Sequence, residues 1–317
     1  MSPDGENQLV MVGPEGGGTI TAVEEAPAVE DAGITKKKGL GFLGWLSAGW
    51  LILIIFAATF ADILPLNDPA ASVAEPRFAP FQSGGPILGS DALGRDILSR
   101  AIYGARMSLI IAFCAVMLGF LIGGFLGLLA GYFRNWAGNL LVGLFDILLA
   151  IPQLVLALAL VSVLKGDPTK GNGLPIPIIL IIALGIVSIP LLARITRAST
   201  LSWSQREFVM AARAQGATHR RILVREVLPN VLPAMVSIAL LGMAIAIVAE
   251  GGLAILGASV APPTATWGTM INDGRSDLKD APFILWIPIF AVFMTAASLN
   301  YLGDAVRDRF DVRESAL

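Results

Sequence analysis

The sequence is poor in the side chains on which most metal sites, disulfide scaffolds and soluble folds depend. It has one cysteine, one histidine and only 15% charged residues, whereas a soluble globular domain carries about 25% charged residues. A single cysteine excludes an intramolecular disulfide, and one cysteine with one histidine cannot supply a His/Cys metal site. The chain also lacks a G-x-x-x-x-G-K-[ST] phosphate loop. We therefore expect it to bind no metal or cofactor and to hydrolyse no ATP itself.

Apolar residues are abundant instead. Hydrophobic side chains make up 55% of the 317 residues, and the mean hydropathy is +0.74. This composition predicts an all-α polytopic membrane protein embedded in a lipid bilayer. The formal net charge is only -2, which gives no reason to expect nucleic acid as a partner.

Six long apolar stretches predict six transmembrane helices, because about 20 apolar residues cross ~30 Å of hydrocarbon. The expected spans are residues 39–61, 107–133, 139–164, 174–193, 230–257 and 282–303. The predicted organisation begins with a disordered acidic tail with a basic end (1–38), a first membrane helix (39–62) and an external segment with an interfacial helix (63–106). A core domain of five spans follows (107–303), which includes a polar loop expected in the cytoplasm (194–229), and the chain ends in a cytoplasmic tail (304–317).

The distribution of Lys and Arg predicts the orientation. If the first span enters from the cytoplasm, 14 of the 22 Lys and Arg residues fall on the cytoplasmic side and eight fall outside. Cytoplasmic loops carry the excess of basic residues in membrane proteins. Both termini are therefore expected in the cytoplasm.

The segment before the second span has a helical pattern. In residues 88–109, apolar positions recur with helical spacing, and the opposite face carries Arg95, Asp96 and Arg100. The pattern fits an interfacial helix. A plainer interpretation, which the periodicity favours, is a solvated helix that only packs on the outer rim. Within the second span, glycines at three- and four-residue spacing predict a face for close helix packing: Gly119, Gly123, Gly124, Gly127 and Gly131.

Two acidic residues fall well inside predicted spans, Asp146 in the third and Glu250 in the fifth. An ionised carboxylate at bilayer depth costs roughly 2.5 to 3.5 kcal/mol, so each needs a partner or water. One interpretation is a proton or cation relay. The other, which we favour because no Lys or His lies in mid-span, is a structural carboxylate that pairs with an arginine or with helix-end amides.

The longest polar stretch, residues 202–233, is also the most basic part of the chain. Ser204 and Glu207 have the spacing of a capping box, and Gly216 is expected to end this first short helix. Thr218 is expected to cap a second helix that stops at Pro229.

Taken together, residues 88–109, 146–156, 207–230 and 250–313 resemble the C-type permease subunits of dipeptide/oligopeptide ABC importers. Particular matches are Gly94-Arg95-Asp96, Tyr103-Gly104, Arg106, Pro262-Pro263, Trp267-Gly268, and Ala211-Ala212 followed by Gly216. Met210 stands where this family usually has a glutamate.

The resemblance implies a type I ABC importer permease fold in the bacterial inner membrane. The implied partners are a homologous second permease subunit, two ATPase subunits that hold ATP and Mg, and an extracytoplasmic substrate-binding protein. It assigns ATPase coupling to Glu207, Met210, Ala211, Ala212, Arg213, Gly216 and Ala217, and an external motif to Gly94, Arg95, Asp96, Tyr103 and Arg106.

Two other classes of function remain as alternatives. A proton-coupled secondary transporter could use Asp146 and Glu250, although no pair of interrupted helices recurs in the two halves of the chain. A purely structural membrane subunit is the third possibility. The resemblance leaves the cargo open among di- and oligopeptides, nickel complexes and other small solutes.

Overall fold

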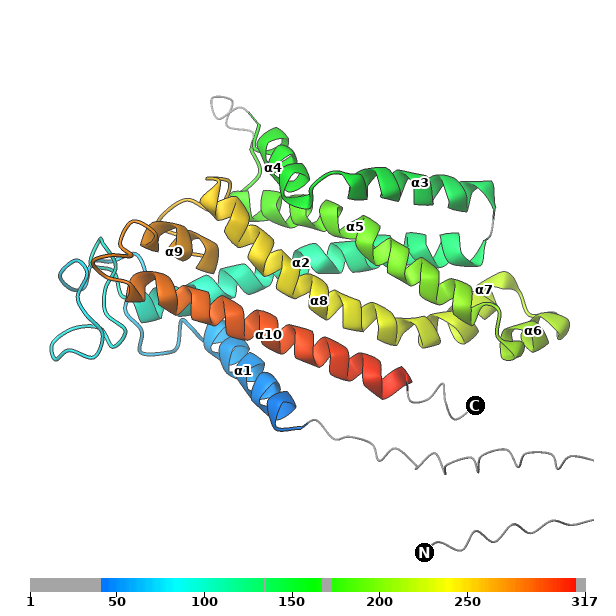
Figure 1. Cartoon of the computed structure of the whole chain (residues 1–317), viewed down its shortest axis with the longest axis horizontal. Coiled ribbons are helices and arrows are strands. Elements are labelled where there is room, and N and C mark those ends of the chain that lie inside the picture. The colour runs from blue at the N-terminus through cyan, green and yellow to red at the C-terminus, as the bar shows by residue number, and fades with distance from the viewer. Residues whose placement is uncertain (1–40, 134, 167–172, 312–317) are drawn as a thin grey trace, which may run out of the picture. The chain divides into compact units, whose positions relative to one another are not determined.

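The computed structural model describes residues 41–133, 135–166 and 173–311, and helices dominate it (Figure 1). The helices are α1 (Phe42–Thr59), α2 (Ile97–Tyr132), α3 (Trp136–Ala150), α4 (Gln153–Leu164), α5 (Ile176–Trp203), α6 (Glu207–Ala214), α7 (His219–Arg221), α8 (Leu228–Ile255), α9 (Trp267–Gly274) and α10 (Phe283–Asp311). A π-helical turn, Ile222–Val227, joins α7 to α8. The tail predicted at residues 1–38 lies outside the described residues.

Five helices in the described part of the chain are long and apolar enough to cross a membrane, and the bent pair α3 and α4 makes a sixth if it counts as one span. α6 and α7 lie at one end of this bundle and α9 at the other (Figure 1). The polar loop and the external segment of the sequence therefore flank the spans from opposite ends.

The prediction of a separate interfacial helix before the second span is wrong. Residues 88–96 form turns and isolated bridges, and α2 runs without a break for 36 residues from Ile97. Asp96 starts the helix, because its side chain accepts a hydrogen bond from the Leu98 N–H at 2.9 Å and another from the Ser99 hydroxyl at 2.7 Å. No helix breaker separates the polar first turns from the apolar remainder. At 1.5 Å per residue, α2 is about 54 Å long.

The third span is not one straight helix. α3 and α4 meet at an angle of 93°, with Ile151 in an extended conformation and Pro152 capping α4. Proline lacks an N–H and disfavours a helical conformation in the residue before it, so the chain turns at this point.

Two expected helix ends are also wrong. α5 continues to Trp203, which places Arg194 and Arg197 on the helix and not in a loop. α10 continues past Gly303 into the predicted tail. Gly303 does not end the helix but permits a close approach to α8: the Ser237 hydroxyl donates to the Gly303 carbonyl at 2.7 Å, and a Cβ at Gly303 would lie 3.0 Å from the Ser237 carbonyl oxygen.

The polar loop follows the predicted two-helix plan only in part. Gly216 ends the first helical run with a φ of +81°, and the Thr218 side chain caps α7, as expected. The prediction of a capping box between Ser204 and Glu207 is wrong. Ser204 caps the end of α5 instead, and its hydroxyl donates to the Leu201 carbonyl. Pro229 does not stop the second helix either. It lies in the first turn of α8, directly after the π-helical turn, and the helix continues through it.

The predicted glycine face of α2 is confirmed as the surface that packs on α5 and α8. A Cβ at Gly123 would lie 2.5 Å from the Ile189 carbonyl oxygen, and one at Gly131 would lie 2.8 Å from the Arg197 carbonyl oxygen. These neighbours are backbone atoms of α5 and cannot move aside. Gly124 instead faces Met235 of α8. The small residues thus let α2 and α5 approach at backbone distance.

Candidate functional site

The helix α6 buries one side and exposes the other. Val209 is fully buried and Ala212 is half-buried. They pack on a hydrophobic cluster that α2, the π-helical turn and α8 supply: Leu128, Tyr132, Ile222, Leu223, Val227, Val231 and Met235. The exposed side carries most of the residues that the resemblance assigns to ATPase coupling: Glu207, Met210, Ala211, Arg213 and, after the helix, Gly216. Ala217 is half-buried beside the cluster.

The exposed side of α6 combines large apolar side chains with small ones. Met210 is 54% exposed and Phe208 is 39% exposed. Ala211 and Ala214, which follow them, are exposed and small. Nothing lies within 4 Å of the place where a Gly216 Cβ would stand, so the positive φ, and not lack of space, explains the glycine.

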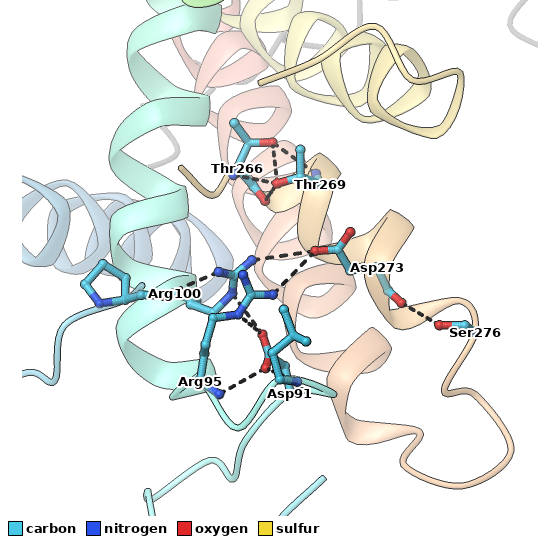
Figure 2. A network of polar contacts seen from close by, with 9 residues as sticks. Asp91, Arg95, Arg100, Thr266, Thr269, Asp273 and Ser276 are labelled. Carbon is cyan, nitrogen blue, oxygen red and sulfur yellow. Dashed lines mark hydrogen bonds and ion pairs between the residues drawn. The ribbon is translucent and has the colours of Figure 1, made fainter. Parts of the chain in front are cut away.

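At the opposite end, charged side chains form a buried network (Figure 2). The Arg95 Nε lies 2.7 Å from the Asp91 Oδ2, and the Arg100 Nε lies 3.4 Å from the same oxygen. Both arginines also approach the Asp273 Oδ2 of α9, at 3.9 Å from Arg95 and 3.6 Å from Arg100. The expectation that Arg95 and Arg100 lie on a solvated face is wrong: they are 7% and 3% exposed. A buried arginine requires carboxylate partners, and two elements supply them here.

The residues of the external motif do not form a single site. Gly94, with a φ of +75°, and Asp96 shape the turn that holds the buried network. Tyr103 and Arg106 point elsewhere and bind the Asp62 carboxylate, at 3.0 Å from the tyrosine hydroxyl and 2.8 Å from the Arg106 Nη1. The hydrogen bond from Arg106 is the main cause that lowers the pKa of Asp62. This second contact ties α2 to the segment that follows α1.

α9 is fixed to α2 by a buried tryptophan. Trp267 is fully buried; its backbone N–H donates to the Ser108 hydroxyl at 3.1 Å and its indole N–H donates to the Ala101 carbonyl at 3.0 Å. Gly104 allows the contact, because a Cβ there would lie 3.3 Å from the Thr266 carbonyl carbon.

Glu250 lies near the end of α8 and attaches it to the start of α9. It is 1% exposed. Its Oε1 accepts hydrogen bonds from the Ser259 hydroxyl at 2.6 Å and the Thr266 hydroxyl at 2.8 Å, and its Oε2 faces Gly268 in the first turn of α9. A carboxylate is stabilised at a helix N-terminus. The arrangement supports the structural interpretation of Glu250, which stays a prediction.

Asp146 is exposed on α3 and faces α5. With Arg194 and Arg197 it lines a cavity of about 130 Å³ between α2, α3 and α5. Opposite charges across a cavity with room for several waters fit a carboxylate that compensates arginines. A second cavity, of about 40 Å³, lies between α2, α4, α5 and α8 and is lined mainly by aliphatic residues. Neither cavity has room for a peptide.

Several important side chains had no signal in the sequence. Asp273 and Thr266 are brought to Arg100 and Glu250 only by the packing of α9. Tyr132 and His219 meet only because the polar loop folds back on α2. Within the described residues, no group of three His, Cys, Asp or Glu side chains is arranged to hold a metal ion.

Comparison with known proteins places the chain in a family. Residues 123–315 match the family of binding-protein-dependent transport system inner membrane components. The dipeptide transport system permease protein of Alkalihalophilus pseudofirmus is 36% identical, over 87% of this chain and 86% of its own length. The di/tripeptide transport system permease of Pseudomonas aeruginosa is 38% identical over 86% of this chain and 88% of its own. The glutathione transport system permease of Pectobacterium atrosepticum is 35% identical over 84% and 86%.

Solved structures agree on the fold. A chain of the inward-facing MetNI methionine ABC transporter covers 66% of this chain and 97% of its own length, with a TM-score of 0.54 and 19% identity. A chain of an amino acid ABC transporter gives a TM-score of 0.50 and 20% identity over 67% of this chain and 94% of its own. The arrangement of helices is that of type I ABC importer permeases. The chain belongs to the binding-protein-dependent transport system inner membrane component family, as a permease subunit of the C type.

Proposed function

We propose that this chain is one of two permease subunits of an ATP-driven importer, and that it forms half of a translocation pathway for di- or oligopeptides. The observation that carries the proposal is its 36% and 38% identity, over most of its length, to permeases named for dipeptides and for di/tripeptides. Glutathione, named for the other relatives, is itself a tripeptide. A cargo with a peptide backbone is common to all of them.

The cavities support a shared pathway. Two cavities between the described spans have volumes of about 40 and 130 Å³, which suits a few water molecules and not a peptide. A peptide pathway therefore needs a second surface. We assign that surface to a homologous second permease subunit.

Coupling to ATP is assigned to the α6–α7 segment, residues 204–227. Its exposed side combines Phe208 and Met210 with small alanines, and small side chains let a partner surface approach the helix backbone. In this proposal two ATPase subunits dock there on the cytoplasmic side, and the substrate-binding protein delivers peptide at the opposite end, near α9. The chain itself hydrolyses nothing.

The rival function is a proton-coupled secondary transporter that uses Asp146 and Glu250. The positions of the two acids do not favour it. Glu250 is held by two hydroxyl groups at the α8–α9 junction, whereas Asp146 lies beside arginines in a cavity between α2, α3 and α5. A relay would need the two acids to be linked.

Transport in proteoliposomes separates the two functions. The chain, its second permease subunit and the ATPases are reconstituted, and uptake of labelled dipeptide, tripeptide and glutathione is measured. We expect uptake only with ATP inside the cytoplasmic compartment and binding protein on the other side. Uptake driven by a pH gradient without ATP would overturn the proposal in favour of the secondary transporter.

A further inference from the structure

The end of α2 touches both parts of the α6–α7 segment through one side chain. Tyr132 is the last residue of α2 and is 7% exposed. Its hydroxyl lies 2.9 Å from the Nδ1 of His219, the first residue of α7, and the two rings stack edge to face with centroids 5.7 Å apart. On α6, the guanidinium carbon of Arg213 lies 5.3 Å from the centroid of the Tyr132 ring. Tyr132 thus bridges the two helices that flank Gly216.

The contacts of Tyr132 with His219 and Arg213 fix the orientation of the α6–α7 segment, which apolar packing alone already holds against α2. Val209, Ile222 and Val227 are fully buried in the cluster next to Tyr132. Apolar burial is non-directional and tolerates sliding, whereas a hydrogen bond and an arginine over a ring fix distance and orientation. A buried tyrosine hydroxyl also needs a polar partner, and in this structure the ring nitrogen of His219 is that partner.

The connections on either side make Tyr132 mechanically important. At its start, the segment continues directly from α5 through Ser204, Gln205 and Arg206. The segment ends with the π-helical turn Ile222–Val227, which leads directly into α8; such irregular turns often mark a functional site in a helix. α2 and α5 are packed at backbone distance along the glycine face. α6 is connected to this helix pair through the chain that follows α5, and the hydroxyl contact of Tyr132 with His219 connects α7 to the same pair.

We propose that Tyr132 is a positioning residue: through His219 and Arg213 it clamps the α6–α7 segment to the α2–α5 pair, so that a displacement of α6 moves α2 and is not absorbed within the segment. The inference rests on the proposed function, because it assumes that ATPases displace α6. α2 is continuous from Tyr132 back to Ile97, next to the network of Arg95 and Arg100. The clamp therefore links the docking surface to the α9 end through a single helix.

The test measures peptide transported per ATP hydrolysed in the reconstituted complex. Tyr132→Phe removes only the hydroxyl and keeps the ring under Arg213. His219→Ala removes the other partner at an exposed position, which leaves the core intact. His219→Gln keeps a side chain that can form hydrogen bonds. Tyr301→Phe, on α10, is the matched control. ATPase binding and detergent melting temperature are measured for every variant.

We expect Tyr132→Phe and His219→Ala to bind the ATPases normally and to lower the peptide-to-ATP ratio about fivefold, the factor that the loss of one hydrogen bond supports. The double variant should be no worse than either single variant, because both remove the same contact. His219→Gln should recover much of the ratio, and Tyr301→Phe should match the wild type.

A wild-type ratio in both Tyr132→Phe and His219→Ala would overturn the clamp, and so would additive losses in the double variant. If Tyr132→Phe does not fold, His219→Ala at its exposed position still decides. Failure of the wild-type chain to bind ATPases would instead overturn the proposed function, and that result is visible before any variant is compared.

Discussion

Arg100 and Arg106 lie on the first turns of α2 and differ in their surroundings. The Arg100 side chain is 4% exposed between Asp91 and Asp273, whereas the Arg106 side chain is 41% exposed and pairs with Asp62 near the surface. We expect Arg100→Gln to lower the free energy of unfolding by about 3 kcal/mol, because it takes one of two arginine partners from the buried Asp91 carboxylate. Arg106→Gln should change stability little. Thermal unfolding in detergent measures both, and equal losses would contradict the distinction.

Asp273 gives stability a specific pH dependence. Burial raises the pKa of this carboxyl group, and Arg100 and Arg95 oppose the shift without cancelling it. The folded protein therefore holds the Asp273 proton more tightly than the unfolded chain does. Its contribution to stability is lost as pH rises from about 4 through the raised pKa. This loss should appear as a fall in melting temperature with rising pH, and Asp273→Asn should remove that fall. The same pH profile in the variant and the wild type would refute the role of Asp273. The pKa of Asp62 is lowered, so its contribution to stability is instead lost as pH falls.

Among the elements, the glycine face of α2 predicts opposite outcomes for two alanine substitutions. A Cβ at Gly123 would lie 2.5 Å from a backbone oxygen of α5, whereas a Cβ at Gly143 of α3 would meet nothing within 4 Å. We expect Gly123→Ala to cost about 1 to 3 kcal/mol through overpacking. Gly143→Ala should be neutral or stabilise by about 0.5 to 1 kcal/mol, because alanine loses less backbone entropy in a helix. Melting temperatures that move in the same direction would contradict this packing.

The helix α6 also yields a sharp pair of variants. Ala211 is exposed, whereas Ala212 is half-buried against the protein's own hydrophobic cluster. A tryptophan at Ala212 would strain the permease itself, so Ala211→Trp is the cleaner probe of docking. We expect it to reduce ATPase binding and peptide uptake together while the melting temperature stays constant. Ala198→Trp, at an exposed position of α5, is the control. Wild-type ATPase binding by Ala211→Trp would remove α6 from the interface.

The elements also separate what the sequence could predict from what it could not. The apolar stretches predicted the membrane helices, and glycine spacing predicted the surface of α2 that packs on α5. Helix ends were harder to predict, because a proline ends a helix in some places and not in others. Pro152 coincides with a 93° bend, whereas Pro190 and Pro233 lie inside continuous helices. In a bundle, neighbouring helices decide whether the freed carbonyl is satisfied. The contact of Arg100 with Asp273 depends on tertiary packing, which no local pattern encodes.

At the scale of the whole molecule, the structure sharpens the test of orientation. Gln215 follows α6 and Ser83 lies in the segment near α9, and both are exposed. With Cys114 replaced, a single cysteine at Ser83 should react with a membrane-impermeant maleimide in intact cells, and one at Gln215 should react only after lysis. The expectation follows from the excess of Lys and Arg on the α6 side. Labelling of Gln215 in intact cells would invert the topology.

The buried network also has a consequence for biosynthesis. A chain made from its amino terminus emerges with Asp91, Arg95 and Arg100 long before Asp273. Until α9 reaches the same side of the membrane, two arginines share one carboxylate of the final set. A nascent chain halted before α9 therefore presents Arg95 and Arg100 with one carboxylate partner fewer than the finished protein provides.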